Sequence, residues 1–230
     1  QNPTPLLRMS EASIATRDYV SALDAQRKAL ALQPDNPQAV VALASTYLMA
    51  GKPEDALAEA RRLQRDRPKA AMGFALEGEL LAAQKKFAEA AVAMGNAQAR
   101  QPTAAIAARQ MAFVQASGRP AEARALAERW IKEHPRDATF WLLLGQHRQG
   151  TDDLTGAASA YRAVLEIDPE NAVALNNLAW ILGEQGRPEA RELAERAYRA
   201  APINPSVVDT LGWILVRQGE VKRGIELLRQ

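Results

Sequence analysis

The two histidines are the first residues to consider for catalysis, because an imidazole can act as a general base near neutral pH. His134 stands directly before Pro135, and His147 is followed by Arg148. Neither has a hydroxyl, thiol or carboxylate partner at the spacing that a nucleophile and its base require. The chain contains no Cys, which removes thiol catalysis, thiolate metal sites and disulfides. We therefore expect no enzyme active site, no cofactor and no metal site in this segment.

Two other motifs also predict structure and not chemistry. The acidic pair Asp152-Asp153 lacks the alternating oxygen ligands and the Glu of a calcium loop, and it stands just before a helical pattern. It predicts a helix cap. Four glycines are solitary and form no phosphate-binding loop, so they predict turns: Gly51, Gly118, Gly186 and Gly219.

The charge balance gives little support for binding to phosphates or to lipid. Lys and Arg number 29 and Asp and Glu 27, so the formal net charge is +2. Short basic runs such as Arg61-Arg62 and Lys85-Lys86 have acidic neighbours. We expect no nucleic-acid partner; an RNA-binding helical repeat stays open as an alternative, and it predicts binding that collapses with salt. No apolar run approaches the roughly 20 residues of a membrane span, so a membrane contact would need an anchor outside this segment.

The elements that must position any site recur with a period near 34 residues. Prolines with this period stand 34, 34, 33, 34 and 33 residues apart, at Pro34, Pro68, Pro102, Pro135, Pro169 and Pro202. Proline has no N–H to donate, so each is expected to end a helix at the same point. Small residues follow each proline by ten positions, at Ala44, Gly78, Ala112, Gly145, Ala179 and Gly212, and others precede it by twelve or keep that register, at Ala22, Ala56, Ala90, Ala123, Ala157, Ala190 and Gly224. We expect helices to approach closely at these positions.

The pattern resembles the tetratricopeptide repeat (TPR), and the resemblance covers essentially the whole chain. Its most regular copies are Leu-Asn-Asn-Leu-Ala-Trp at 175–180 and Thr-Leu-Gly-Trp at 210–213. Glu77 departs from the family pattern, because it stands in an apolar position. The resemblance implies an all-α fold, a right-handed superhelical solenoid of about seven helical hairpins in one domain. We place the repeats at residues 5–36, 37–70, 71–104, 105–137, 138–171, 172–204 and 205–230, the last one truncated.

A second resemblance concerns the setting. The Ala-rich repeats, with the motif ending at Trp180 followed one repeat later by Asp-Thr-Leu-Gly-Trp at 209–213, are similar to TPR lipoproteins of bacterial exopolysaccharide and exosortase (PEP-CTERM) gene clusters. That resemblance implies a scaffold in the periplasm or at the outer membrane of a Gram-negative bacterium; a cytoplasmic location is the alternative. Because the segment begins at Gln1 and ends within a repeat, we expect a longer natural protein. We also expect the uncovered last repeat to favour self-association.

The family resemblance implies that the partner is a protein or a peptide. In this family the first helix of each hairpin lines a concave groove that holds extended segments. The mostly apolar composition of the expected groove favours an apolar or aromatic segment over a densely charged one. The candidate residues are Arg109, Phe113, Gln146, Asn176, Asn177, Trp180, Asp209 and Trp213, with Val41, Ser45, Leu48, Ala75, Glu79 and Leu142 on the same expected face.

Three of these candidates have two interpretations each. The Asn177 carboxamide can both donate to and accept from a peptide amide, or it can bond a neighbouring hairpin. Trp180 and Trp213 can hold a partner side chain between them, or they can pack sideways between hairpins. A carboxylate clamp of the kind found in chaperone-type TPR domains is rejected, because the matching positions hold no cation: Leu142, Gln146, Ser206 and Thr210.

The preferred hypothesis is a non-catalytic scaffold that binds a protein or peptide segment in its groove. A competing hypothesis makes the segment the recognition module of a larger enzyme, such as a glycosyltransferase, whose catalytic domain lies elsewhere.

Overall fold

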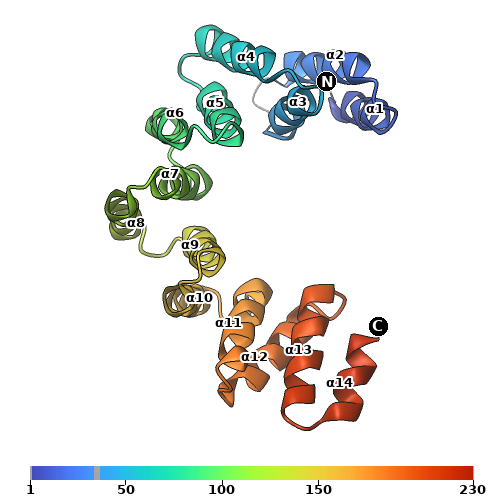
Figure 1. Ribbon diagram of the computed structural model, residues 1–230, viewed down its shortest axis with the longest axis vertical. Helices are drawn as coiled ribbons and strands as arrows, with labels where there is room; N and C mark the ends of the chain where they lie inside the picture. The colour runs from blue at the N-terminus through green and yellow to red at the C-terminus, as the bar shows by residue number, and fades with distance from the viewer. Residues whose placement is uncertain (1, 34–36, 230) are drawn as a thin grey trace. The chain divides into compact units, whose positions relative to one another are not determined.

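The computed structural model describes residues 2–33 and 37–229, which form fourteen helices and no strand. Successive helices pair as seven hairpins (Figure 1). The helices are α1 (Thr4–Ala15), α2 (Tyr19–Leu32), α3 (Pro37–Met49), α4 (Pro53–Asp66), α5 (Met72–Ala83), α6 (Phe87–Arg100), α7 (Ala104–Ala116), α8 (Pro120–Glu133), α9 (Ala138–Gly150), α10 (Leu154–Ile167), α11 (Ala172–Glu184), α12 (Glu189–Ala200), α13 (Pro205–Arg217) and α14 (Val221–Leu228).

The repeated prolines from Pro68 to Pro202 each follow the second helix of a hairpin, as predicted. The helices α4, α6, α8, α10 and α12 each end two residues before a proline of the series. Pro34 lies outside the described residues. Several following helices begin with a side-chain cap: Thr103, Asp137 and Asn171 each accept a hydrogen bond from the backbone N–H three residues later. In these loops the proline and the polar cap together keep the connection between hairpins to a few residues.

Each hairpin turns at one residue in the left-handed backbone region. The four predicted turn glycines have positive φ, from 68° at Gly51 to 91° at Gly219. The other three hairpins use Arg17, Lys85 and Asp152 at the same place, with φ of 60°, 60° and 61°. A side chain with a Cβ is strained in this region, so these three positions were not evident from residue type.

The periodic small residues lie where helices meet, which confirms the predicted close approach. Twelve of the thirteen are buried, and Ala112 is half-buried. A methyl group on Gly212 would lie 3.0 Å from the carbonyl oxygen of Gly224, one helix away. The small residues therefore set the distance between the two helices of a hairpin.

The chain divides into two compact units, residues 1–128 and 129–230, and each is described by itself. In the first unit the buried Gln26 joins three helices, because its amide nitrogen donates to Ser10 Oγ and Thr46 Oγ1, both at 2.8 Å. In the second unit α11 to α14 stack as two neighbouring hairpins around Ile181, Leu211 and Leu215 (Figure 1). Among the described helices, none has the length and apolar character needed to cross a bilayer.

Candidate functional site

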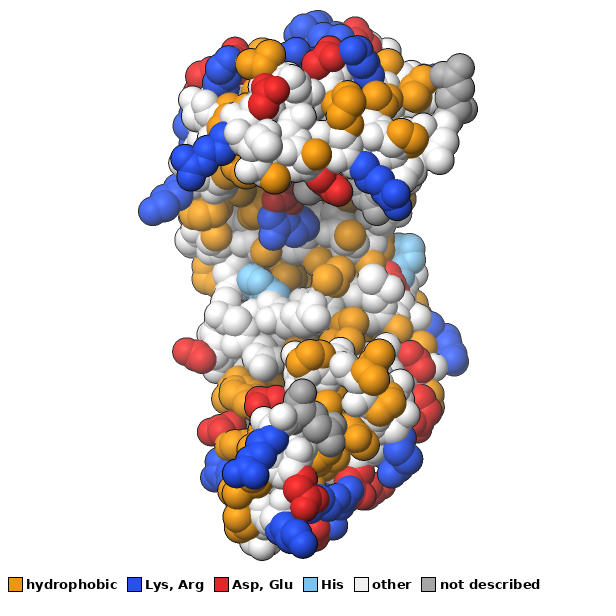
Figure 2. Space-filling model, turned by 90° about the vertical axis from the view of Figure 1, so that its right-hand side faces the viewer, with side chains coloured by type: hydrophobic (Ala, Val, Ile, Leu, Met, Phe, Trp, Pro, Cys, Tyr) orange, Lys and Arg blue, Asp and Glu red, His pale blue; other side chains and the backbone are white. Residues whose placement is uncertain are grey.

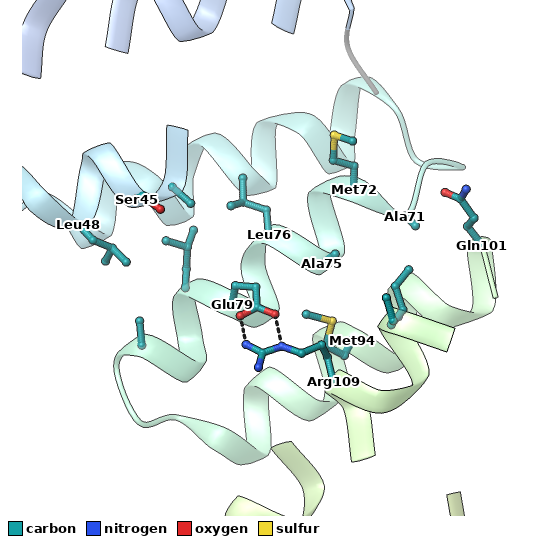
Figure 3. A pocket seen from close by; sticks show the side chains of 15 residues that line it. Ser45, Leu48, Ala71, Met72, Ala75, Leu76, Glu79, Met94, Gln101 and Arg109 are labelled. Carbon is teal, nitrogen blue, oxygen red and sulfur yellow. Dashed lines mark hydrogen bonds and ion pairs between the residues drawn. The ribbon is translucent and has the colours of Figure 1, made fainter. Parts of the chain in front are cut away.

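A cleft of about 530 Å³ opens in the first unit between α3, α5, α6 and α7 (Figure 3). Five of its lining residues are alanines, which leave space because their side chains end at Cβ: Ala44, Ala71, Ala75, Ala83 and Ala105. The larger apolar lining residues are Leu48, Met72, Leu76, Leu80, Met94 and Ile106, and the polar ones are Ser45, Glu79, Gln101 and Arg109. A cleft of this size and composition is typical of sites that hold several apolar side chains.

Five residues of the expected groove face line this cleft: Ser45, Leu48, Ala75, Glu79 and Arg109. Val41 belongs to the same expected face, but its side chain lies outside the described part. Met94 was not among the predicted groove residues, yet it reaches the cleft from α6 because Gly78 opposes it. A methyl group on Gly78 would lie 3.1 Å from Met94 Cγ. The sequence signal that could have placed Met94 in the cleft was Gly78, a glycine of the periodic small-residue series that stands opposite a long side chain.

An ion pair joins α5 to α7 across the cleft. Arg109 Nε donates to Glu79 Oε1 at 2.7 Å, and Nη2 donates to Oε2 of the same carboxylate (Figure 3). The Arg109 guanidinium also lies over the Phe113 ring, 4.7 Å from its centroid. Phe113, predicted as a groove residue, is only 5% exposed and supports the Arg109 guanidinium from below. The pair is accessible, because the side chains of Arg109 and Glu79 are 50% and 39% exposed.

In the second unit a chain of hydrogen bonds holds Asn177. Asn176 Nδ2 donates to Asn177 Oδ1 at 3.3 Å, Asn177 Nδ2 donates to the Tyr161 hydroxyl at 3.1 Å, and that hydroxyl donates to Gln149 Oε1 at 2.8 Å. Burial raises the pKa of Tyr161, and the hydrogen bond from Asn177 opposes that rise. Asn176, predicted as a groove residue, is only 9% exposed, and its side chain lies among protein groups. These contacts favour the structural interpretation of Asn177.

Trp180 and Trp213 are half-buried and pack against the core of the second unit. Trp213 lies on Gly183 of α11, where a methyl group would come within 2.6 Å of its Cζ3 atom. The Arg217 guanidinium covers the Trp213 ring at 4.8 Å from the centroid. These contacts favour sideways packing between hairpins for Trp213. The remaining candidates, Gln146 and Asp209, are exposed.

The two histidines and the acidic pair Asp152-Asp153 lie in places where their neighbours give them structural roles. The exposed His134 lies beside Trp130, with ring centroids 4.2 Å apart. Burial, together with the charge of Arg148, lowers the pKa of His147. Asp153 caps α10 by accepting from Gly156 N at 2.9 Å, which confirms the predicted cap. Within residues 2–33 and 37–229, no group of three or more His, Asp or Glu side chains is placed to hold a metal ion.

The charged side chains on the face shown in Figure 2 are of mixed sign. Lys and Arg alternate with Asp and Glu and do not gather in a single basic or acidic patch on that face. Within each unit charged side chains form ion pairs, for example Arg61 with Glu77 and Arg196 with Glu170. Such surfaces supply little long-range attraction for a highly charged partner.

The comparisons with known proteins agree on the family. Three family models, all described as tetratricopeptide repeat, match residues 13–80, 115–172 and 160–192, which together make up more than half of the chain. The chain is therefore a tetratricopeptide-repeat protein, a class whose repeats serve as scaffolds for protein interactions.

Two curated relatives are similar over parts of the chain. The TPR repeat-containing protein PA4667 of Pseudomonas aeruginosa is 30% identical over 149 residues, which are 62% of this chain and 25% of that protein. The probable biofilm formation methyltransferase WspC of Pseudomonas putida is 35% identical over 85 residues, which are 36% of this chain and 20% of that protein. The chain thus matches a quarter or less of the length of these relatives.

Solved structures share the fold. Yeast Tom70 matches 98% of this chain and 48% of its own, with a TM-score of 0.75 and 14% identity. A tetratricopeptide repeat protein from Parabacteroides merdae matches 98% of this chain and 90% of its own, with a TM-score of 0.55 and 13% identity. At these identities the likeness shows the fold alone, an all-α superhelical repeat.

Proposed function

We propose that this chain is a non-catalytic scaffold that holds an apolar protein segment in the cleft of its first unit. The observation that carries the proposal is the cleft itself, which is lined by Ala, Leu, Met and Ile on three first helices and one second helix. Burying one Leu or Met side chain there would contribute about 1.5–3 kcal/mol. Because α3, α5 and α7 already hold the lining residues in place, little ordering entropy is lost on binding.

The test is a selection of peptides from a random displayed library, followed by affinity measurement on purified protein. Ala75 lines the cleft, so Ala75→Phe fills it, whereas the exposed Ala58 on α4 lies outside the cleft and provides a matched Ala58→Phe control. Selected peptides should be rich in apolar residues and lose at least tenfold in affinity for Ala75→Phe, a loss of about 1.4 kcal/mol. Equal affinity for the parent and Ala75→Phe, with circular dichroism showing both folded, contradicts the proposal.

A second candidate function is supported by the match to the methyltransferase. A region 35% identical over 85 residues makes up a fifth of a protein whose name includes an enzyme activity. The present chain would then be the recognition module of a longer enzyme. The full-length sequence, followed by an activity assay of any adjoining domain, distinguishes this candidate from an independent scaffold.

For the setting we propose the envelope of a Gram-negative bacterium, in exopolysaccharide production or PEP-CTERM protein sorting, with no nucleic-acid partner. The support is the resemblance of the 175–180 and 209–213 motifs to TPR lipoproteins of those systems. Fractionation of cells that express the tagged full-length protein tests this proposal. Recovery in the periplasmic or outer-membrane fraction is expected, and recovery in the cytoplasm contradicts it.

We also propose that the segment self-associates through its last hairpin. Val221, Ile225 and Leu228 on α14 are 47%, 38% and 45% exposed. Apolar side chains exposed together favour association. Light scattering should show a mass that rises with concentration, and a strict monomer at high concentration contradicts this proposal.

A further inference from the structure

We propose that the ion pair between Glu79 and Arg109 makes the cleft selective for one kind of protein segment. That segment buries an apolar side chain, its anchor, in the cleft and has an uncharged residue next to the anchor. A main-chain amide of the segment contacts the ion pair. This inference rests on the proposed function, because it names the chemistry of the segment that the cleft holds. Both residues line the cleft, and their side chains are accessible to a ligand.

The pair carries the only ionisable side chains among the described residues that line the cleft. Its two hydrogen bonds are bidentate, so the positive and the negative charge compensate each other at the cleft wall. An acidic ligand residue would be attracted by Arg109 and repelled by Glu79 at similar distances, and the reverse holds for a basic residue. Neither would recover the hydration that it loses in an apolar cleft.

A peptide amide suits the hydrogen-bonding capacity that the pair has left. Arg109 Nη1 donates to no group among the described residues, and the Glu79 carboxylate has lone pairs beyond the two that Arg109 uses. A peptide unit offers one acceptor and one donor, so its carbonyl can accept from Nη1 while an N–H donates to Glu79. The Phe113 ring beneath Arg109 keeps the guanidinium in place for this contact.

Two substitutions separate the charges: Glu79→Gln keeps the size of the side chain, and Arg109→Gln shortens it. Glu79→Gln leaves Arg109 as the one charge at the cleft, and Arg109→Gln leaves Glu79. The proposal therefore predicts opposite changes of preference: the first variant should favour an acidic neighbour and the second a basic one. Glu122→Gln is the matched control, because Glu122 pairs with Arg119 on the same unit and lies outside the cleft.

The experiment uses three peptides that share a selected apolar anchor and differ at the adjacent residue, which is Gln, Glu or Lys. The parent and Glu122→Gln should bind the Gln peptide about tenfold more tightly than either charged one, Glu79→Gln should bind the Glu peptide best, and Arg109→Gln the Lys peptide. Equal binding of all three to the parent, or an order unchanged in both variants, overturns the inference. If the charge preference fails but Ala75→Phe still abolishes peptide binding, the proposed function survives. If the parent binds none of the three peptides, both the inference and the proposed function are overturned.

Discussion

Gly145 of α9 lies directly against the Tyr161 ring of α10, and a methyl group on Gly145 would come within 2.6 Å of Tyr161 Cε1. Tyr161 is fully buried and makes two hydrogen bonds through its hydroxyl, so the ring has little freedom to move away. This contact shows why the repeat needs a small residue at that register. The aromatic side chain of the second helix occupies the space that a side chain on the first helix would otherwise fill.

Gly145→Ala should lower the free energy of unfolding by about 1–2 kcal/mol, because overpacking costs about 1–3 kcal/mol and the gain in helix propensity returns at most about 1. Gly150 on the same helix provides the control, since a methyl group there meets nothing within 4 Å. Gly150→Ala should leave stability unchanged or raise it. Denaturant titrations of both variants test this prediction, and equal midpoints would contradict it.

Lys85→Gly should raise stability by about 0.5 kcal/mol. Lys85 turns its hairpin with φ of 60°, a conformation that costs an L-residue about 1–2 kcal/mol. Glycine relieves this strain, but its larger conformational entropy in the unfolded chain offsets part of the gain in stability. The neighbouring Lys86 has φ of −83°, so Lys86→Gly should not stabilise the protein. A thermal melt compares the two, and a higher midpoint for Lys86→Gly than for Lys85→Gly would be the contrary outcome.

Asn177→Ala should lower stability by about 1 kcal/mol if Asn177 acts through Tyr161 and Asn176, as its hydrogen bonds indicate. Gln146 is an exposed candidate of the same groove face, and Gln146→Ala should change stability by less than about 0.5 kcal/mol. Loss of peptide binding by Asn177→Ala with unchanged stability would instead support the interpretation that Asn177 contacts a ligand.

The last hairpins should lose stability as the pH falls below the ordinary pKa of a Glu carboxyl, roughly 4.3. Burial disfavours the ionised form of Glu195, but hydrogen bonds from Arg223 and Arg191 outweigh it, and the pKa lies below its ordinary value. A carboxyl with a lowered pKa in the folded state stabilises above its unfolded pKa, and that contribution disappears as the pH falls through the folded pKa. Melting midpoints between pH 7 and 3 should fall less steeply for Glu195→Gln than for the parent.

The repeat pattern predicted the hairpins because proline and small residues act through local rules. A proline that follows a helix cannot continue it, because it has no N–H to donate, and a position that must be small accepts only Ala or Gly. The same register placed Ala75 and Arg109 on one face, and both line the cleft.

What the pattern left open depends on side-chain geometry across helices. The partner of Asn177 is Tyr161 on the preceding hairpin, and no spacing rule gives the rotamers that bring them together. Lys85 adopts a glycine-like backbone because the hairpin requires a turn at that place, whatever the residue. Tertiary contacts decided these features, and residue type alone could not reveal them.

The most direct test of the account is an NMR titration of protein labelled at its methionine methyl groups with a selected apolar peptide. Met72 and Met94 line the cleft, whereas Met9 lies exposed on α1 and serves as an internal reference. Binding in the cleft predicts shifts of the Met72 and Met94 signals that saturate together, with the Met9 signal unchanged. Saturable binding that leaves Met72 and Met94 unshifted would contradict the cleft as the binding site.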